Sequence, residues 1–132
     1  MSWSCSSRYA VVAGAAVAIV CAGSSREAFA RKQYMDEFKA MYVKTDGAND
    51  AEKALAAAVE TAKCNVCHVG SVKKDRNAYG NAMTERLDKN DKDAAKIKKV
   101  LEEVASLSSD PAKAGSPTFG ALLKEGKLPG GN

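Results

Sequence analysis

Histidine and cysteine are scarce in this chain of 132 residues. His68 is the one histidine, and two of the four cysteines, Cys5 and Cys21, lie within the first 30 residues. The rest of the chain therefore holds a single cysteine pair, Cys64 and Cys67, which excludes a small scaffold held together by several disulfides. No Ser-His-Asp, paired-carboxylate or phosphate-loop pattern stands out, so the sequence does not predict an enzyme.

Aromatic residues are also few, at 6% of the chain, and no stretch is strongly basic. The lysines are scattered among acidic residues, and the formal net charge is only +4. Nucleic-acid-binding domains gather their basic residues on one face, so we expect no nucleic-acid partner. Runs of alternating β-branched residues are missing too, which argues against a β-sheet.

The first 30 residues have the layout of a secretory signal peptide. Arg8 precedes an apolar run over residues 9–22, and Ala28-Phe29-Ala30 forms a small-x-small end. This pattern predicts cleavage after Ala30 and export to the periplasm or another extracytoplasmic space. The apolar run is shorter than the roughly 20 residues that cross a bilayer, so we expect no permanent membrane span. Residues 31–127 then form one domain, followed by a flexible tail over residues 128–132.

Apolar residues recur every three or four positions through most of the domain, which indicates helices. Asn49, with Glu52 three residues later, predicts the start of the second helix, and Asn77 predicts the start of the third. Ser116 and Pro117 predict the start of a short last helix. The predicted fold is all-α and single-domain, with helices over residues 31–43, 49–63, 77–89, 90–107 and 116–126.

The segment Cys64-Asn65-Val66-Cys67-His68 is the Cys-x-x-Cys-His sequence of covalent haem attachment. One helical turn between the cysteines brings both sulfurs near the two vinyl groups of the porphyrin, and the next residue is carried beneath the iron. A zinc site, a thioredoxin-like redox pair and a plain disulfide are the alternatives. Structural zinc normally takes four ligands, and a thioredoxin-like pair follows a strand rather than a helix. The motif therefore predicts one covalent haem c with its iron.

The motif, the export signal and the helical pattern together resemble the monohaem c-type cytochrome family. Residues 63–70 and 75–80 also resemble a group of small exported cytochrome c-like proteins. The resemblance implies a small all-α domain packed around the haem. It further implies thioether bonds at Cys64 and Cys67, with His68 as the proximal iron ligand.

The second axial ligand is less clearly indicated. Ordinary small cytochromes c use a methionine on a loop far downstream of the motif, whereas Met83 is the only methionine after this motif and falls in a predicted helix. Met41 and Met35, in the first predicted helix, are alternatives, because some helical-bundle cytochromes take this ligand from the first helix. Bis-histidine ligation within one chain is excluded. Water, an open position or a lysine such as Lys73 complete the choices.

Two further groups of residues have alternative interpretations. One group is predicted either to line the haem or to pack in the core: Tyr79, Phe119, Leu122 and Leu123. A basic group flanks the motif: Lys63, Lys73, Lys74 and Arg76. It forms either a positive ring that steers an acidic redox partner or an ordinary solvated loop.

The leading hypothesis is an exported electron carrier with one haem that exchanges single electrons with a redox partner protein. A five-coordinate haem protein that binds or senses a small ligand is one alternative. A haem subunit of a larger exported oxidoreductase is another.

Overall fold

The structure is a computed structural model that describes residues 26–131. Within this range the chain is helical and forms no strand, only two isolated bridges, so the predicted all-α class is confirmed. The signal peptide predicted for residues 1–30 lies largely outside the described residues. The elements, in chain order, are α1 (Arg26–Tyr42), α2 (Asp50–Ala62), the 3₁₀-helix η1 (Lys63–Val66), α3 (Ala78–Thr84), α4 (Ala94–Ala105) and α5 (Phe119–Lys124).

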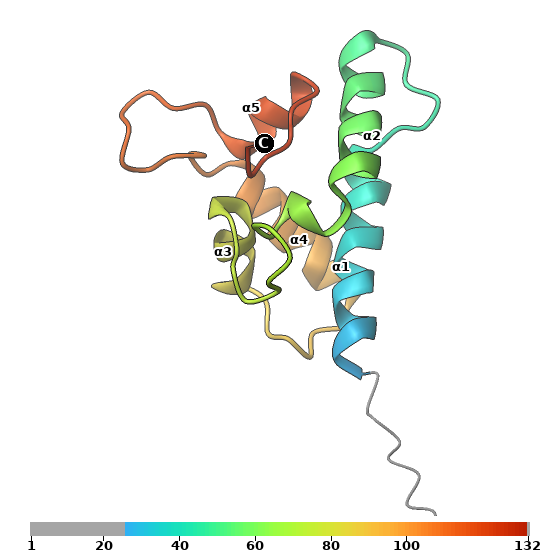
Figure 1. The fold of residues 1–132 in the computed structure, drawn as a ribbon, viewed down its shortest axis with the longest axis vertical. Helices are drawn as coiled ribbons and strands as arrows, with labels where there is room; N and C mark the ends of the chain where they lie inside the picture. The colour runs from blue at the N-terminus through green and yellow to red at the C-terminus, as the bar shows by residue number, and fades with distance from the viewer. Residues whose placement is uncertain (1–25, 132) are drawn as a thin grey trace, which may run out of the picture.

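Helix α1 runs along one side of the domain and packs against helix α4, which lies in the middle (Figure 1). Tyr34 and Met35 of α1, beyond the predicted cleavage point after Ala30, pack against the core. Phe38 of α1 is buried, and Tyr42 donates a hydrogen bond from its hydroxyl to the carbonyl oxygen of Leu101 in α4, at 3.0 Å. None of the described helices is long and apolar enough to span a membrane.

One hydrophobic core joins all five helices and η1. At its centre the Tyr79 ring lies edge-on to Phe38 and to Phe119, with centroid distances of 5.9 and 5.2 Å. Aromatic rings favour such edge-to-face contacts, so α1, α3 and α5 are held together at this point. The buried apolar residues are Phe38, Leu55, Val59, Val66, Tyr79, Met83, Leu87, Ile97, Val100, Leu101, Val104, Phe119, Leu123 and Leu128.

Capping side chains set the starts of the helices. Asn49 accepts a hydrogen bond from the backbone N–H of Glu52, and Asn77 accepts one from Gly80, as the sequence predicted. Helix α4 starts later than residue 90, because Asp93 caps it while Asp91 accepts a hydrogen bond from the Asp88 N–H in the preceding turn. Helix α3 is shorter than predicted and ends at Thr84.

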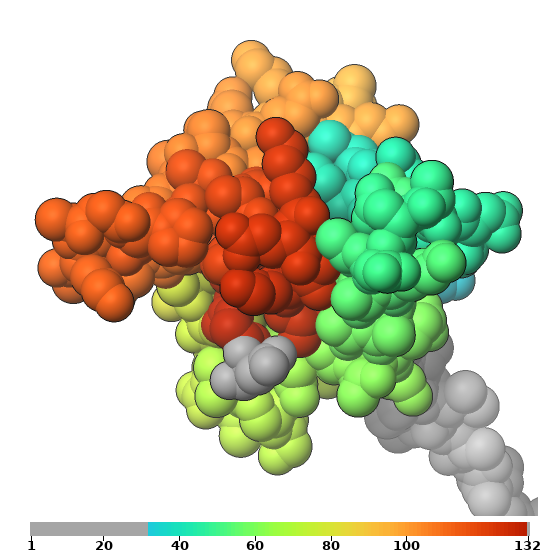
Figure 2. All heavy atoms as spheres, turned by 90° about the horizontal axis from the view of Figure 1, so that it is seen from above, coloured from blue at the N-terminus to red at the C-terminus, as the bar shows by residue number. Residues whose placement is uncertain are grey.

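The start of the last helix was predicted wrongly. Thr118 rather than Ser116 caps α5, since its hydroxyl accepts a hydrogen bond from the Ala121 N–H at 3.1 Å. The Pro117 carbonyl instead accepts a hydrogen bond from the Ser109 N–H, which closes the base of loop 108–117. This loop projects away from the body of the domain in both views (Figures 1 and 2).

Residues 128–130 are more tightly packed than the flexible tail that the sequence predicts over residues 128–132. Leu128 is 9% exposed and belongs to the core, and Pro129 is fully buried. Gly130 lies so close to Asn77 that an added Cβ would be 1.9 Å from the Asn77 amide nitrogen. The apolar Leu128-Pro129 pair is what holds this end, because it removes apolar surface from water.

Because Thr118 rather than Ser116 caps α5, removing these two hydroxyls should change the free energy of unfolding by different amounts. Thr118→Ala should lower the free energy of unfolding by about 1 kcal/mol, because the Ala121 N–H loses its acceptor. Ser116→Ala should change it by less than about 0.5 kcal/mol, as for most surface positions. Urea unfolding followed by circular dichroism measures both. A larger loss in Ser116→Ala would move the helix start back to Ser116.

Candidate haem-binding site

The cysteine motif follows directly from helix α2. Cys64 lies in η1, and the backbone N–H groups of Cys67 and His68 both donate to the Cys64 carbonyl oxygen, at 3.3 and 3.1 Å. Cys64 and Cys67 are thus one tight turn apart, as the sequence predicted. Lys63 has φ 49°, a left-handed conformation that costs a lysine free energy. This residue turns the chain out of the axis of α2 and into the motif.

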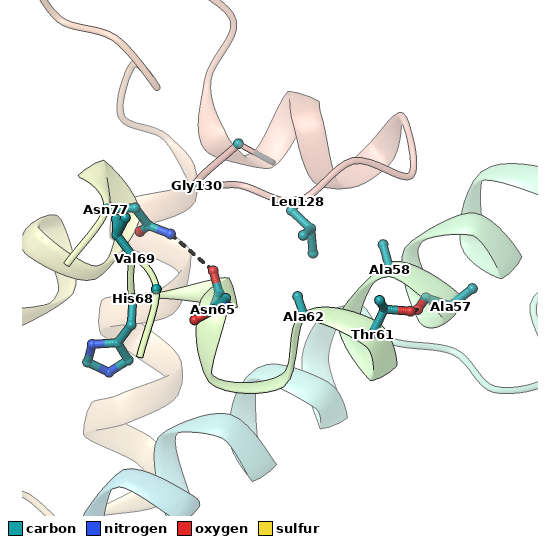
Figure 3. A pocket seen from close by; sticks show the side chains of 12 residues that line it. Ala57, Ala58, Thr61, Ala62, Asn65, His68, Val69, Asn77, Leu128 and Gly130 are labelled. Atoms are coloured by element: carbon teal, nitrogen blue, oxygen red, sulfur yellow. Dashed lines mark hydrogen bonds between the residues drawn. The ribbon is translucent and has the colours of Figure 1, made fainter. Parts of the chain in front are cut away.

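The start of α3 clamps the backbone of the motif. The Asn77 side-chain amide donates to the Asn65 carbonyl oxygen at 3.3 Å (Figure 3) and to the Val66 carbonyl oxygen at 3.0 Å. The Asn77 side-chain oxygen accepts a hydrogen bond from the Gly80 N–H. The Asn77 backbone N–H donates to the Cys67 carbonyl oxygen, at 3.2 Å. One asparagine therefore caps α3 and fixes the motif at the same time.

Glycine is required at position 80 for this contact. A Cβ there would lie 2.0 Å from the Cys67 carbonyl oxygen, so any other residue would push α3 away from the motif. The sequence predicted the cap at Asn77 but not its second role. The sequence signal for this second role is the close spacing of Asn77 and Gly80, which follow the motif by fewer than about fifteen residues.

A cavity of about 450 Å³ opens between α1, the motif and α3. Cys64, Cys67 and His68 all line it, together with Met35 from α1 and Met83 from α3. Its wall is mostly apolar, as is usual for small-molecule and cofactor sites of this size. The fold therefore brings the three motif residues and two methionines from distant segments to one space.

The imidazole of His68 is half-buried. Its Nδ1 atom is shielded from solvent and has no hydrogen-bond partner among the described residues. Figure 3 shows the ring turned away from Leu128 and from the alanines of α2. Buried polar atoms are normally paired, so Nδ1 is a ring nitrogen that a group outside the described residues could still bind.

A second groove, of about 600 Å³, lies on the other side of the motif (Figure 3). Alanines of α2, Asn65, Asn77 and the chain end around Leu128 line it, and His68 is the one residue that it shares with the first cavity. Neither cysteine lines this groove. The chemistry of the motif is therefore directed at the smaller cavity.

The predicted methionines and haem-wall residues differ in whether they line the cavity. Met83 is buried and lines the cavity, whereas Met41 packs against the core and does not line it. Tyr79 also lines the cavity, whereas Phe119 and the two leucines Leu122 and Leu123 do not. Phe119 and Leu123 are both buried, and the Phe119 ring packs against the Tyr79 ring. The core interpretation therefore holds for these two residues.

Several positive side chains line the cavity, and none of the acidic residues whose side chains the structure describes does. Of the predicted basic group, Lys63, Lys73 and Arg76 line the cavity, but Lys74 does not. Three lysines that the sequence did not single out complete the lining: Lys32, Lys39 and Lys89. Within the described part of the chain, Lys39 is the one member with an ion pair, to Glu60.

The two cysteines of the motif are free thiols. Cys64 is exposed, and burial raises the pKa of Cys67 to about 12. The motif follows helix α2 rather than a strand, which weighs against a thioredoxin-like pair. Among residues 26–131, no three His, Cys, Asp or Glu side chains gather as ligands of a metal ion.

Comparison with models of protein families, with curated proteins and with solved structures finds no match to this chain. A function for this chain is therefore inferred from the motif and from the cavity that surrounds it.

The hydrogen bonds from Asn77 to the motif, here called the clamp, predict that two nearby asparagines differ in how much they stabilise the fold. Asn77→Ala should lower the free energy of unfolding by about 2 kcal/mol, since it removes a helix cap and leaves two motif carbonyls without their donor. Asn81→Ala should cost less than about 0.5 kcal/mol, because its side chain is exposed and makes only one long contact, to the Arg76 carbonyl, at 3.5 Å. Urea unfolding of both variants tests this. Equal losses would contradict the clamp.

Proposed function

We propose that this chain is an exported c-type cytochrome that carries one covalent haem and transfers single electrons. The observation that carries the proposal is the cavity into which Cys64, Cys67 and His68 all open. Two thiols and an imidazole in this order are the donor set of haem attachment. Met35 and Met83, in the wall of the same cavity, add the thioethers that a haem iron can also bind.

The residues of the site then take distinct roles. Cys64 and Cys67 form the thioethers, and His68 binds the iron on the proximal side. Met83 is the proposed distal ligand because it is buried and lines the cavity. The apolar wall excludes water from the porphyrin, and the clamp at Asn77 holds the motif in register with α3. When bound, the haem supplies an iron that alternates between Fe(III) and Fe(II).

The basic lining suggests the chemistry of the partner. Lys63, Lys73 and Arg76 lie close to the motif, where the edge of the haem would meet solvent. Positive charge around such an edge accelerates and orients encounters with an acidic surface. The proposed partner is an acidic redox protein in the compartment that the signal peptide would reach. The chain itself acts as an electron carrier rather than an enzyme.

Haem attachment is the direct test of this proposal. The full chain is expressed together with a cytochrome c maturation system, and covalent haem is measured by the pyridine haemochrome spectrum and by haem staining on denaturing gels. We expect one haem per chain, and none in Cys64→Ala/Cys67→Ala, because no thiol is left to form a thioether. Ser71→Ala, in the exposed loop after the motif, is the matched control and should keep its haem. A wild-type chain without covalent haem would contradict the proposed function.

The distal ligand gives a second test on the matured protein. A methionine ligand makes the iron low-spin and produces a weak far-red absorption band in the oxidised form. We expect Met83→Ala to lose this band and Met41→Ala to keep it, because Met83 lines the cavity and Met41 does not. Loss of the band in Met35→Ala instead would place the ligand on α1. A high-spin wild-type spectrum that shifts with carbon monoxide would favour the ligand-binding alternative.

A further inference from the structure

Residues 126–130, here called the strap, lie behind the cysteine motif. Leu128 and Gly130 line the second groove together with Asn65 and His68 of the motif, and neither of these two strap residues lines the cavity that holds both cysteines. Figure 3 shows the His68 ring turned away from Leu128. The strap therefore supports the motif on the side away from the cavity.

The strap is fixed at its start to helix α2. Gly126 has φ 79°, and a Cβ at this position would lie 2.6 Å from the Ala51 carbonyl oxygen, so the backbones of the strap and of α2 are in contact. Leu128 and Pro129 follow, and both are buried. The strap thus has a firm attachment to the helix that leads into the motif.

At its other end the strap meets the clamp. A Cβ at position 130 would lie 1.9 Å from the Asn77 amide nitrogen and 2.3 Å from its Cγ atom. The described glycines with positive φ do not include Gly130, so its backbone does not itself require glycine. The Asn77 amide cannot move aside without losing its bonds to Asn65, Val66 and Gly80. Glycine is therefore needed at position 130 because the clamp occupies the space of a side chain.

The strap in this way connects segments that lie before and after the motif in the chain. Helix α2 leads into Cys64, while the Asn77 backbone N–H donates to the Cys67 carbonyl oxygen at 3.2 Å. The His68 N–H in turn donates to the Cys64 carbonyl oxygen at 3.1 Å. The place of the His68 imidazole depends on this backbone, so a segment that holds Asn77 against the motif also holds His68.

We propose that the strap positions His68, with Gly130 keeping the Asn77 amide in place against the motif. Gly130 and Asn77 are then positioning residues, because neither lines the cavity and both act through the motif backbone. The inference rests on the proposed function for the role of His68 as an iron ligand. It adds a support for that ligand from a segment that is distant in the sequence.

Amide hydrogen exchange tests the contact, on the full chain as isolated after expression with the maturation system. Gly130→Ala should speed exchange at the His68 and Gly80 amides by a factor of about 5 to 100, because the added methyl displaces the Asn77 amide and leaves its partners unpaired. The amides of α4 should change much less, because the opening is local. Unchanged exchange at both His68 and Gly80 would overturn the proposal.

Gly131→Asn is the matched control. A Cβ at position 131 would meet nothing within 4 Å, and asparagine tolerates the positive φ of this residue. Exchange at the His68 and Gly80 amides should therefore stay within about twofold of the wild type, as for most surface substitutions. The same acceleration in Gly131→Asn as in Gly130→Ala would contradict a specific contact with Asn77.

A double variant shows whether Gly130 acts through Asn77. In Asn77→Ala/Gly130→Ala the amide is gone, so the added methyl has space, and exchange at His68 should match that of Asn77→Ala within about twofold. A clear further acceleration in the double variant would show that Gly130→Ala acts by another route and would refute the proposal. This comparison holds even if Gly130→Ala alone fails to fold.

The haem itself reports the orientation of His68. In proton NMR of the oxidised, matured protein, the paramagnetic shifts of the haem methyl groups depend on the orientation of the axial imidazole. Gly130→Ala should change these shifts, and Gly131→Asn should keep the wild-type pattern. A wild-type pattern in Gly130→Ala would also overturn the proposal. Failure of the proposed function is distinguishable, because the wild-type chain would then lack covalent haem, while the exchange measurements still report on the strap.

Discussion

The contact between the start of α3 and the backbone of the cysteine motif is the constraint on which the rest of the site depends. Asn77 binds the carbonyls on one side of the motif, and Gly80 allows α3 to touch the Cys67 carbonyl. Because α3 is fixed in this way, Tyr79 and Met83 are placed on the wall of the cavity. The same contact also receives the chain end, since Gly130 packs on the Asn77 side chain.

The two walls of the cavity come from distant parts of the sequence. Helix α1 supplies Met35 and α3 supplies Met83, and they are held together through Phe38 and Tyr79 in the core. The motif needs only local geometry to present two thiols and an imidazole. The environment that would set the properties of a haem, namely its distal side and its surrounding charge, depends on the tertiary fold.

The motif and the helical class could be recognised from the sequence because both depend on residues that lie close together along the chain. Cys64, Cys67 and His68 are recognised by spacing alone, and the Asn49 and Asn77 caps by residue type. The cavity lining could not be predicted, because Lys32 and Lys89 reach it only after α1 and α3 have packed. The start of α5 was predicted wrongly because Ser116, Pro117 and Thr118 are all good starting residues, and only the hydrogen bond to Ala121 decides among them.

Loop 108–117 projects from the body of the domain, and none of its residues lines either cavity. Its base is closed by the hydrogen bond between the Ser109 N–H and the Pro117 carbonyl, so extra residues at its tip would add little strain to the helices. The tip of this loop is therefore a suitable site at which to attach another group to the domain. A surface tether or an affinity tag inserted there would leave the cysteine motif facing solution, free to meet other proteins.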